Sequence, residues 1–130
     1  MILGTGTDLI DIRRIERALA RFGHRFARRV LVDEEYQRYI AHVKPAHYVA
    51  KRFAAKEAFS KAMGTGIHFP VNWHNVSVAN ERSGKPYLKF SEPLAALLKQ
   101  RGISRAHLSL SDEIEMACAF VILEGEDRGG

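Results

Sequence analysis

The alternation of apolar and polar positions predicts strands at both ends of the chain and helices between them. Residues 2–10 are rich in β-branched side chains and predict a first strand, in which two glycines thin one face. Apolar residues then recur at helical spacing from Ile12. Helices are predicted over residues 12–22 and 46–63, after Asp33 and from Ser91 to Arg101, and hairpins are predicted to pair residues 76–79 with 87–90 and residues 106–110 with 116–123.

Capping residues set the ends of these helices. Asp11, Asp33 and Ser91 each precede a helical pattern and are expected to act as N-caps. Gly23 and Gly64 follow such patterns and are expected to end them. A helix that instead ran straight through Gly23 would bring five arginines onto one face: Arg14, Arg17, Arg21, Arg25 and Arg28.

Helices and hairpins alternate here without a strict strand–helix–strand repeat, which favours an α+β fold with an antiparallel sheet and packed helices. The 130 residues suit a single domain, expected to span residues 1–124, with a frayed tail at 125–130. No apolar run approaches the ~20 residues of a membrane span. The single cysteine, Cys118, is read as a core residue, and a cytoplasmic location is expected.

Basic residues are concentrated near the N-terminus of a chain whose net charge is +5. Seven arginines lie between Arg13 and Arg29, with only Glu16 to oppose them. Such a run is either a solvated face or a docking surface for an acidic partner.

Three residues carry candidate chemistry. Asp8 lies inside the predicted first strand, where it is either a strand-end cap or a ligand for a hard cation. Glu57 and Lys61 lie four apart on one helix face, as a surface ion pair or as a metal ligand beside a phosphate-binding cation.

Other common motifs do not fit the chain. The Gly4-Thr5-Gly6 segment lies within a predicted strand and lacks the third glycine of a dinucleotide fingerprint. Gly64-Thr65-Gly66 follows a helix, whereas a phosphate loop precedes one. The six histidines show no zinc spacing.

Four sequence blocks together resemble the short type of 4′-phosphopantetheinyl transferase, the holo-acyl-carrier-protein synthase family. The resemblance covers about residues 2–124, and the four blocks occur in the family's order and spacing. They are Gly4–Ile12 with Arg14-Ile15-Glu16, Arg52–Ala62 with Gly64-Thr65-Gly66, Asn80 with Gly84-Lys85-Pro86, and His107–Asp112.

This resemblance implies an enzyme of fatty acid biosynthesis that moves phosphopantetheine from coenzyme A to a serine of apo acyl carrier protein and releases adenosine 3′,5′-bisphosphate. It also implies that Asp8 and Glu57 hold Mg²⁺, and that Glu57 and Lys61 are catalytic. The general base stays open between Glu57, a metal-bound water and Asp112.

The same resemblance implies a coenzyme site, a carrier-docking surface and a homotrimer with active sites between subunits. The expected coenzyme-binding residues are Arg52, Ser60, Lys61, Gly64, Gly84, Lys85, Pro86, His107, Ser111 and Asp112. The residues expected to dock the acidic carrier protein are Arg14, Arg21, Phe22, Arg25, Phe26 and Arg29.

Two other functions compete with this one. A nucleic-acid-binding module is supported only by the basic helix, without a zinc finger, basic aromatic sheet or recognition-helix pattern. A catalytically inactive relative that only binds carrier protein is opposed by the presence of Asp8, Glu57 and Lys61. Binding to membranes or nucleic acid is therefore not expected.

Overall fold

The terminal strands form an antiparallel sheet with one covered face and one open face. The computed structural model describes residues 1–127. Strand β1 (Ile2–Asp11) pairs with β5 (Met116–Gly125), which pairs with β4 (Ile103–Asp112), so the strand order is β1-β5-β4. The predicted α+β fold with an antiparallel sheet and packed helices is confirmed.

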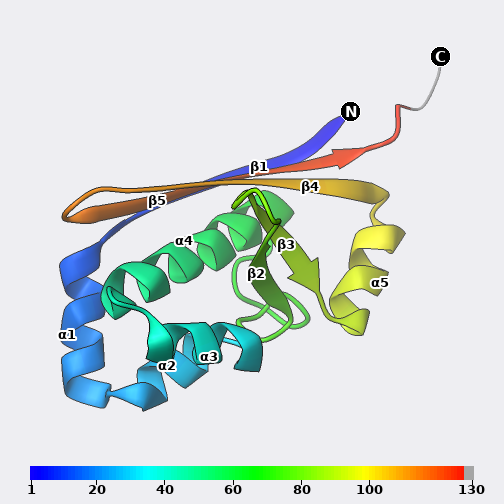
Figure 1. Cartoon of the computed structure of the whole chain (residues 1–130). Coiled ribbons are helices and arrows are strands. Elements are labelled where there is room, and N and C mark those ends of the chain that lie inside the picture. Colours follow the sequence, from blue (N-terminus) through cyan, green and yellow to red (C-terminus); the bar gives the residue numbers. More distant parts are fainter. Residues whose placement is uncertain (128–130) are drawn as a thin grey trace.

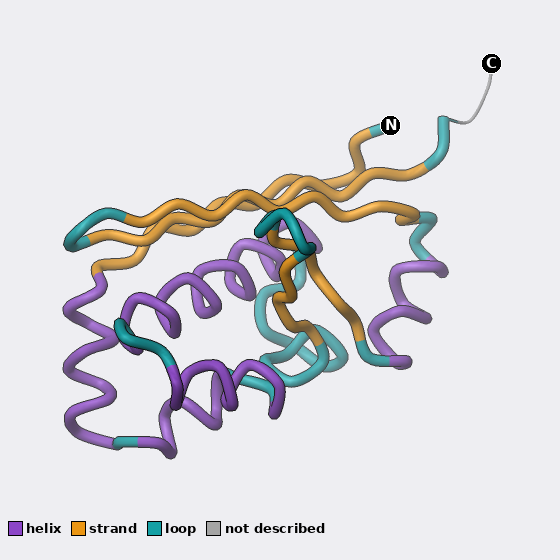
Figure 2. Tube along the Cα trace, viewed as in Figure 1, coloured by secondary structure: helices purple, strands orange, loops and turns teal. Residues whose placement is uncertain are grey.

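All of the helices lie on one side of this sheet (Figure 1). The β2–β3 hairpin stands between α4 and α5 (Figure 2). Within residues 1–127, no helix has the length and apolar character needed to cross a membrane. The remaining elements are α1 (Ile12–Phe22), α2 (His24–Val30), α3 (Asp33–Ala41), α4 (Pro45–Met63), β2 (Val76–Asn80), β3 (Pro86–Phe90) and α5 (Glu92–Gln100).

The opposite face of the sheet has no covering element among the described residues (Figure 1). Leu9 of β1 is 65% exposed and Phe120 of β5 is 42% exposed. Thr7, Phe120 and Ser109 form one cross-strand row on this face, with polar residues on both sides of the aromatic ring. This open sheet face therefore carries exposed apolar side chains among polar ones.

Two glycines allow β1 to lie directly against α4. A Cβ atom added at Gly4 would collide with the backbone carbonyl of Ala62, and one at Gly6 would collide with that of Ala58. Small residues on both elements therefore let strand and helix backbones approach closely. The face of β1 that the two glycines were predicted to thin is thus the face that packs against α4.

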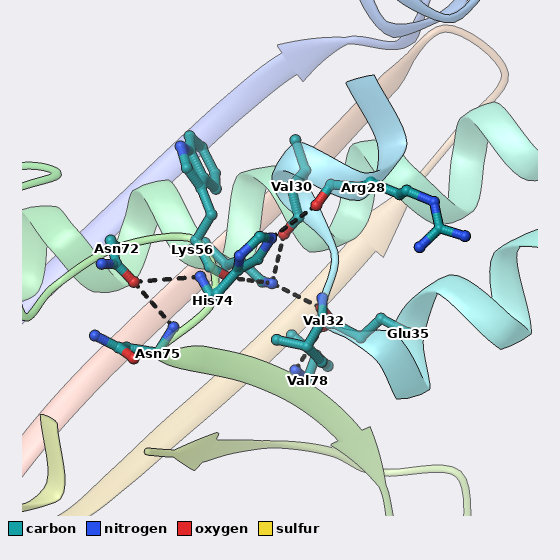
Figure 3. A network of polar contacts seen from close by, with 10 residues as sticks. Arg28, Val30, Val32, Glu35, Lys56, Asn72, His74, Asn75 and Val78 are labelled. Atoms are coloured by element: carbon teal, nitrogen blue, oxygen red, sulfur yellow. Dashed lines mark hydrogen bonds and ion pairs between the residues drawn. The ribbon is translucent and has the colours of Figure 1, made fainter. Parts of the chain in front are cut away.

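A buried ion pair joins α4 to the segments on its other side (Figure 3). Lys56 is fully buried, and its Nζ atom donates to Glu35 Oε1 at 2.7 Å, to the Val30 carbonyl at 2.7 Å and to the Trp73 carbonyl at 2.8 Å. The three ammonium hydrogens thus each have an acceptor. Burial lowers the pKa of Lys56, and the charge of Glu35 opposes that shift.

Both oxygens of the Glu35 carboxylate also accept hydrogen bonds from the backbone. Its Oε1 atom accepts from the Val32 amide at 3.0 Å, and its Oε2 atom accepts from the Val78 amide of β2 at 2.8 Å. The pair therefore connects the end of α2, the start of α3, α4, the loop before β2 and β2 itself.

The structure changes three details of the predicted helices. Gly23 has φ of 61° and ends α1, but a separate helix α2 begins at once, so the five arginines do not share one straight helix. Helix α3 begins at Asp33, and its capping contact comes from Glu35, so the prediction of an Asp33 cap is wrong. Ser91 occupies the N-cap position of α5, but its hydroxyl makes no capping hydrogen bond.

The end of the chain is ordered further than the sequence pattern suggested. Gly125 is buried in β5, and its amide donates to the Met1 carbonyl at 2.8 Å. Asp127 lies 2.9 Å from the N-terminal ammonium. The rest of the predicted frayed tail, residues 128–130, lies outside the described residues.

We expect Lys56→Met to lower the free energy of unfolding by about 3–5 kcal/mol, because Glu35 would be left buried without its cation. Lys51→Met is the matched control: this lysine lies on the same helix, and its 3.5 Å ion pair with Asp112 is partly exposed. Its loss should cost less than about 1 kcal/mol. Urea unfolding of both variants measures the difference, and equal midpoints would contradict a structural role for the buried pair.

Candidate active site

The close packing of β1 on α4 brings Asp8 beside the outer face of the helix. Asp8 lies two residues after Gly6, and its side chain is 15% exposed. Lys61 Nζ lies 3.1 Å from Asp8 Oδ1 and donates to the Thr7 carbonyl at 3.1 Å. Lys61 thus pairs with Asp8 of β1, and not with Glu57 of its own helix as the surface ion-pair interpretation required.

Glu57 lies one helical turn before Lys61 on the same face of α4. Burial raises the pKa of Glu57 above its ordinary value, the charge of Asp8 adds to the rise, and Lys61 opposes it. A cation bound beside Glu57 and Asp8 would offset the repulsion that disfavours the ionised form of Glu57. The ammonium group of Lys61 adds a positive charge beside Asp8 at the same site.

The donor set fits magnesium better than a softer metal. Carboxylate oxygens suit Mg²⁺, which keeps several waters and takes one or two protein carboxylates along with substrate phosphates. Among residues 1–127 there is no group of three or more His, Cys, Asp or Glu side chains that could form a closed metal cage. An open site of two carboxylates and a lysine can therefore bind a cation together with a phosphate-bearing ligand.

Several predicted coenzyme residues lie on a different side of α4. Arg52 is five residues from Glu57, which places the two about 140° apart around the helix axis. Arg52 is 5% exposed, its guanidinium lies 4.0 Å above the Tyr48 ring, and its Nη2 atom donates to Asn80 Oδ1 at 3.2 Å. Within one chain, the surroundings of Arg52 and the acid pair of Asp8 and Glu57 therefore face different sides of α4.

The turn of the β2–β3 hairpin carries Gly84, Lys85 and Pro86 on the Arg52 side. Asn80 Nδ2 donates to the Gly84 carbonyl at 3.0 Å, and Gly84 has φ of 96°, in the region that glycine adopts readily. Lys85 is exposed. An exposed cation beside glycine backbone is suited to a phosphate.

The remaining predicted coenzyme residues are more scattered. His107 and Ser111 are exposed on β4, on the open sheet face, where His107 Nε2 lies 2.9 Å from Glu124 Oε1 and lowers the pKa of that acid. Asp112 pairs with Lys51 at 3.5 Å. Ser60 is 1% exposed and its hydroxyl donates to the Glu57 carbonyl, while Gly64 caps α4 in the left-handed conformation.

The predicted carrier-docking residues occupy two consecutive helices. Arg14, Arg21 and Phe22 are exposed on α1, and the Arg21 guanidinium lies 5.1 Å above the Phe22 ring. Arg25 and Arg29 are exposed on α2, where Phe26 is half-buried. We call these six residues the arginine surface.

Sequence reasoning missed an aromatic pair beside the acids. Phe53 lies one turn before Glu57, and its ring stacks on Trp73 at a centroid distance of 5.0 Å. Both rings are half-buried. The spacing of Phe53 and Glu57 was visible in the sequence, but the partner comes from a loop that no local pattern places there. The positions of Tyr48 under Arg52 and of the Asn80 side chain were also missed.

Comparison with known proteins identifies the family. The family model of the 4′-phosphopantetheinyl transferase superfamily matches residues 4–119. The holo-[acyl-carrier-protein] synthase of Nitrosomonas europaea is 56% identical over 124 residues, covering 95% of this chain and 99% of that protein. That of Vibrio cholerae is 49% identical over the same length, covering 98% of its own chain.

Solved structures agree with this result. The holo-[acyl-carrier-protein] synthase of Neisseria meningitidis superposes with a TM-score of 0.92 at 45% identity, over 95% of this chain and 99% of that one. The enzyme of Bacillus anthracis, in complex with CoA (3′,5′-ADP), superposes with a TM-score of 0.81 at 38% identity, over 97% and 99% of the two chains.

The fold and these matches define a phosphopantetheinyl transferase, so the prediction of an enzyme is confirmed. The chain belongs to the 4′-phosphopantetheinyl transferase superfamily, among its holo-[acyl-carrier-protein] synthases, as the four sequence blocks implied.

We expect Glu57→Gln to raise the melting temperature of the metal-free protein at pH 7. The raised pKa means that the folded state binds the Glu57 proton more tightly than the unfolded chain does. The ionised group therefore destabilises the metal-free fold at neutral pH, and the difference should vanish as the pH falls below the ordinary glutamate range.

Added Mg²⁺ supplies the second half of this experiment. It should raise the melting temperature of the wild type but not that of Glu57→Gln, because binding to the folded state alone stabilises it. Glu16→Gln, at an exposed acid of α1, is the control and should respond to Mg²⁺ as the wild type does. An equal Mg²⁺ response in all three proteins would exclude Glu57 as a metal ligand.

Proposed function

We propose that this enzyme transfers 4′-phosphopantetheine from coenzyme A to a serine of apo acyl carrier protein, with Mg²⁺, and releases adenosine 3′,5′-bisphosphate. The observation that carries this proposal is the meeting of Asp8, Glu57 and Lys61 at the β1–α4 contact. Asp8 and Glu57 would hold the metal ion. When bound, it would offset negative charge on the phosphates of coenzyme A.

The chain's own groups account for the other requirements of the transfer. The serine oxygen forms a bond to the phosphorus that bears pantetheine, and the bond from that phosphorus to the bridging oxygen breaks, with its electrons leaving on the nucleotide. Lys61, 53% exposed beside Asp8, is within reach of a phosphate oxygen and would neutralise the leaving charge.

The acceptor of the serine proton stays open between Glu57 and a water on the metal ion, both of which would lie at this site. Asp112 is the weaker candidate, because its Oδ1 atom is paired with Lys51 Nζ at 3.5 Å. A carboxylate tied to a lysine on another element is poorly available to an incoming hydroxyl.

We infer that the coenzyme site forms between subunits of a homotrimer. Arg52, Lys85 and their neighbours lie on the side of α4 away from the acid pair, so the two sets face apart within one chain. His107 and Ser111 lie on the open sheet face, beside the exposed Leu9 and Phe120. Packing that face on a second copy would bury the apolar side chains and join the two half-sites.

A contact of this kind is heterologous, because the acid side of one chain meets the coenzyme side of the next. Heterologous contacts give closed assemblies when the rotation closes into a ring. The family resemblance gives that ring three members. Each active site would then contain Asp8 and Glu57 from one subunit and Lys85 from its neighbour.

The arginine surface is the proposed docking site for the acidic carrier protein. Its cations are exposed on α1 and α2, and Phe22, 51% exposed, offers an apolar anchor among them. These positive charges should speed association with the acidic carrier protein. The affinity for the carrier protein should fall as salt is added, because salt screens exposed charges. Because acyl carrier protein serves fatty acid synthesis, and a single cysteine suits a reducing compartment, we propose a cytoplasmic role in that pathway.

The proposal predicts a defined mass change. Incubated with coenzyme A, Mg²⁺ and apo carrier protein, the enzyme should increase the carrier mass by one phosphopantetheine, seen by intact-protein mass spectrometry. Excess chelator should abolish the change and Mg²⁺ should restore it. Added salt should raise the Michaelis constant for the carrier protein more than that for coenzyme A, because exposed charges are screened within about 10 Å.

The alternatives give different results in the same assay. A carrier-binding relative without activity would bind the carrier and leave its mass unchanged. A nucleic-acid-binding module would do neither. Full transfer in the presence of excess chelator would contradict the metal part of the proposal alone.

A further inference from the structure

Asn80 bridges the α4 helix and the turn of the β2–β3 hairpin. Its Oδ1 atom accepts from Arg52 Nη2 at 3.2 Å, and its Nδ2 atom donates to the Gly84 carbonyl at 3.0 Å. A guanidinium can only donate and a carbonyl can only accept, so the two partners fix which end of the amide faces which. An aspartate at this position would keep the first contact and lose the second.

The helix side of this bridge is rigid. Arg52 is 5% exposed and lies over the Tyr48 ring, which is itself 4% exposed. Within residues 1–127, the Arg52 Nε atom and the Tyr48 hydroxyl are buried without a hydrogen-bond partner. The contact with Asn80 is therefore one of the few polar interactions that this guanidinium makes, and stacking holds it in place.

The turn side depends on local contacts alone. The Gly84 amide donates to the Glu81 carbonyl at 2.9 Å, and the Glu81 amide donates to the Lys85 carbonyl at 2.8 Å. Gly84 has φ of 96°, so the turn includes the residue type with the greatest backbone freedom. The exposed residues 81–85 would fluctuate without a further tether.

We propose that Asn80 is a positioning residue that holds the Gly84–Lys85 turn against Arg52, so that the turn is preformed for the phosphates of coenzyme A. Arg52 then contributes to coenzyme binding through Asn80, by fixing the turn. This inference rests on the proposed function for the identity of the ligand. The preformed turn is a property of the free protein and can be measured without any ligand.

The first test compares Asn80→Ala, Asn80→Asp and Ser77→Ala, the last a control in the same strand. Both Asn80 variants should raise the Michaelis constant for coenzyme A by roughly fivefold to tenfold, the effect of one lost hydrogen bond. Turnover at saturating coenzyme A and the Michaelis constant for the carrier protein should stay near wild type. The melting temperature of Asn80→Ala should fall by no more than a few °C, the effect of leaving the buried Arg52 guanidinium without this acceptor, so that the variant stays folded in the assay. Ser77→Ala should match the wild type throughout.

The aspartate variant decides which contact matters. If Asn80→Asp matches the wild type while Asn80→Ala is impaired, the contact with Arg52 is sufficient and the role in positioning the turn is wrong. Unchanged Michaelis constants in both variants would also overturn the inference. So would losses in melting temperature that explain the whole effect.

Amide hydrogen exchange provides a test that is independent of coenzyme A. The Gly84 and Glu81 amides should exchange faster in both Asn80 variants than in the wild type and Ser77→Ala, while core amides of β5 stay unchanged. If the wild-type enzyme does not transfer phosphopantetheine, the proposed function fails, and exchange at the turn still decides the role of Asn80. Equal exchange rates in all four proteins would refute that role.

Discussion

The buried ion pair between Lys56 and Glu35 is the contact on which the arrangement of this protein depends. Its charges are fully hydrogen-bonded, by groups drawn from α2, α3, α4, the loop before β2 and β2 itself. Desolvation offsets much of the energy of such a pair, so its main effect is on geometry rather than on net stability. It fixes the rotation of α4 about its axis, and with it the outward direction of Glu57, the next residue.

Helix α4 then serves two sites that face apart. On one side, the glycines of β1 bring Asp8 against the helix beside Glu57 and Lys61. On the other side, Arg52 supports the hairpin turn through Asn80. We propose that a second chain, packed on the open sheet face where Leu9 and Phe120 are exposed, completes the site.

Local sequence signals identified the parts of this fold that depend on local chemistry. Gly23 and Gly64 end helices where predicted, and the spacing of Glu57 and Lys61 placed them on one face. The sequence did not reveal that a second helix follows Gly23 at once, or that Glu35 rather than Asp33 caps α3. Nor could it show that Lys56 is buried while Glu57 faces outward, since adjacent charged residues in a helix give no periodic signal. These features depend on partners distant in sequence.

Complementation between two inactive chains tests directly whether each active site is shared between subunits. Glu57→Gln removes one half of the proposed site, and Lys85→Glu removes the other half. If each site takes its acid pair from one chain and its hairpin turn from the next, random mixing should leave about a quarter of the sites with both halves intact. We expect coexpressed or reassembled mixtures to regain carrier modification to about that fraction. Mixtures as inactive as the separate variants would show that each site lies within one chain.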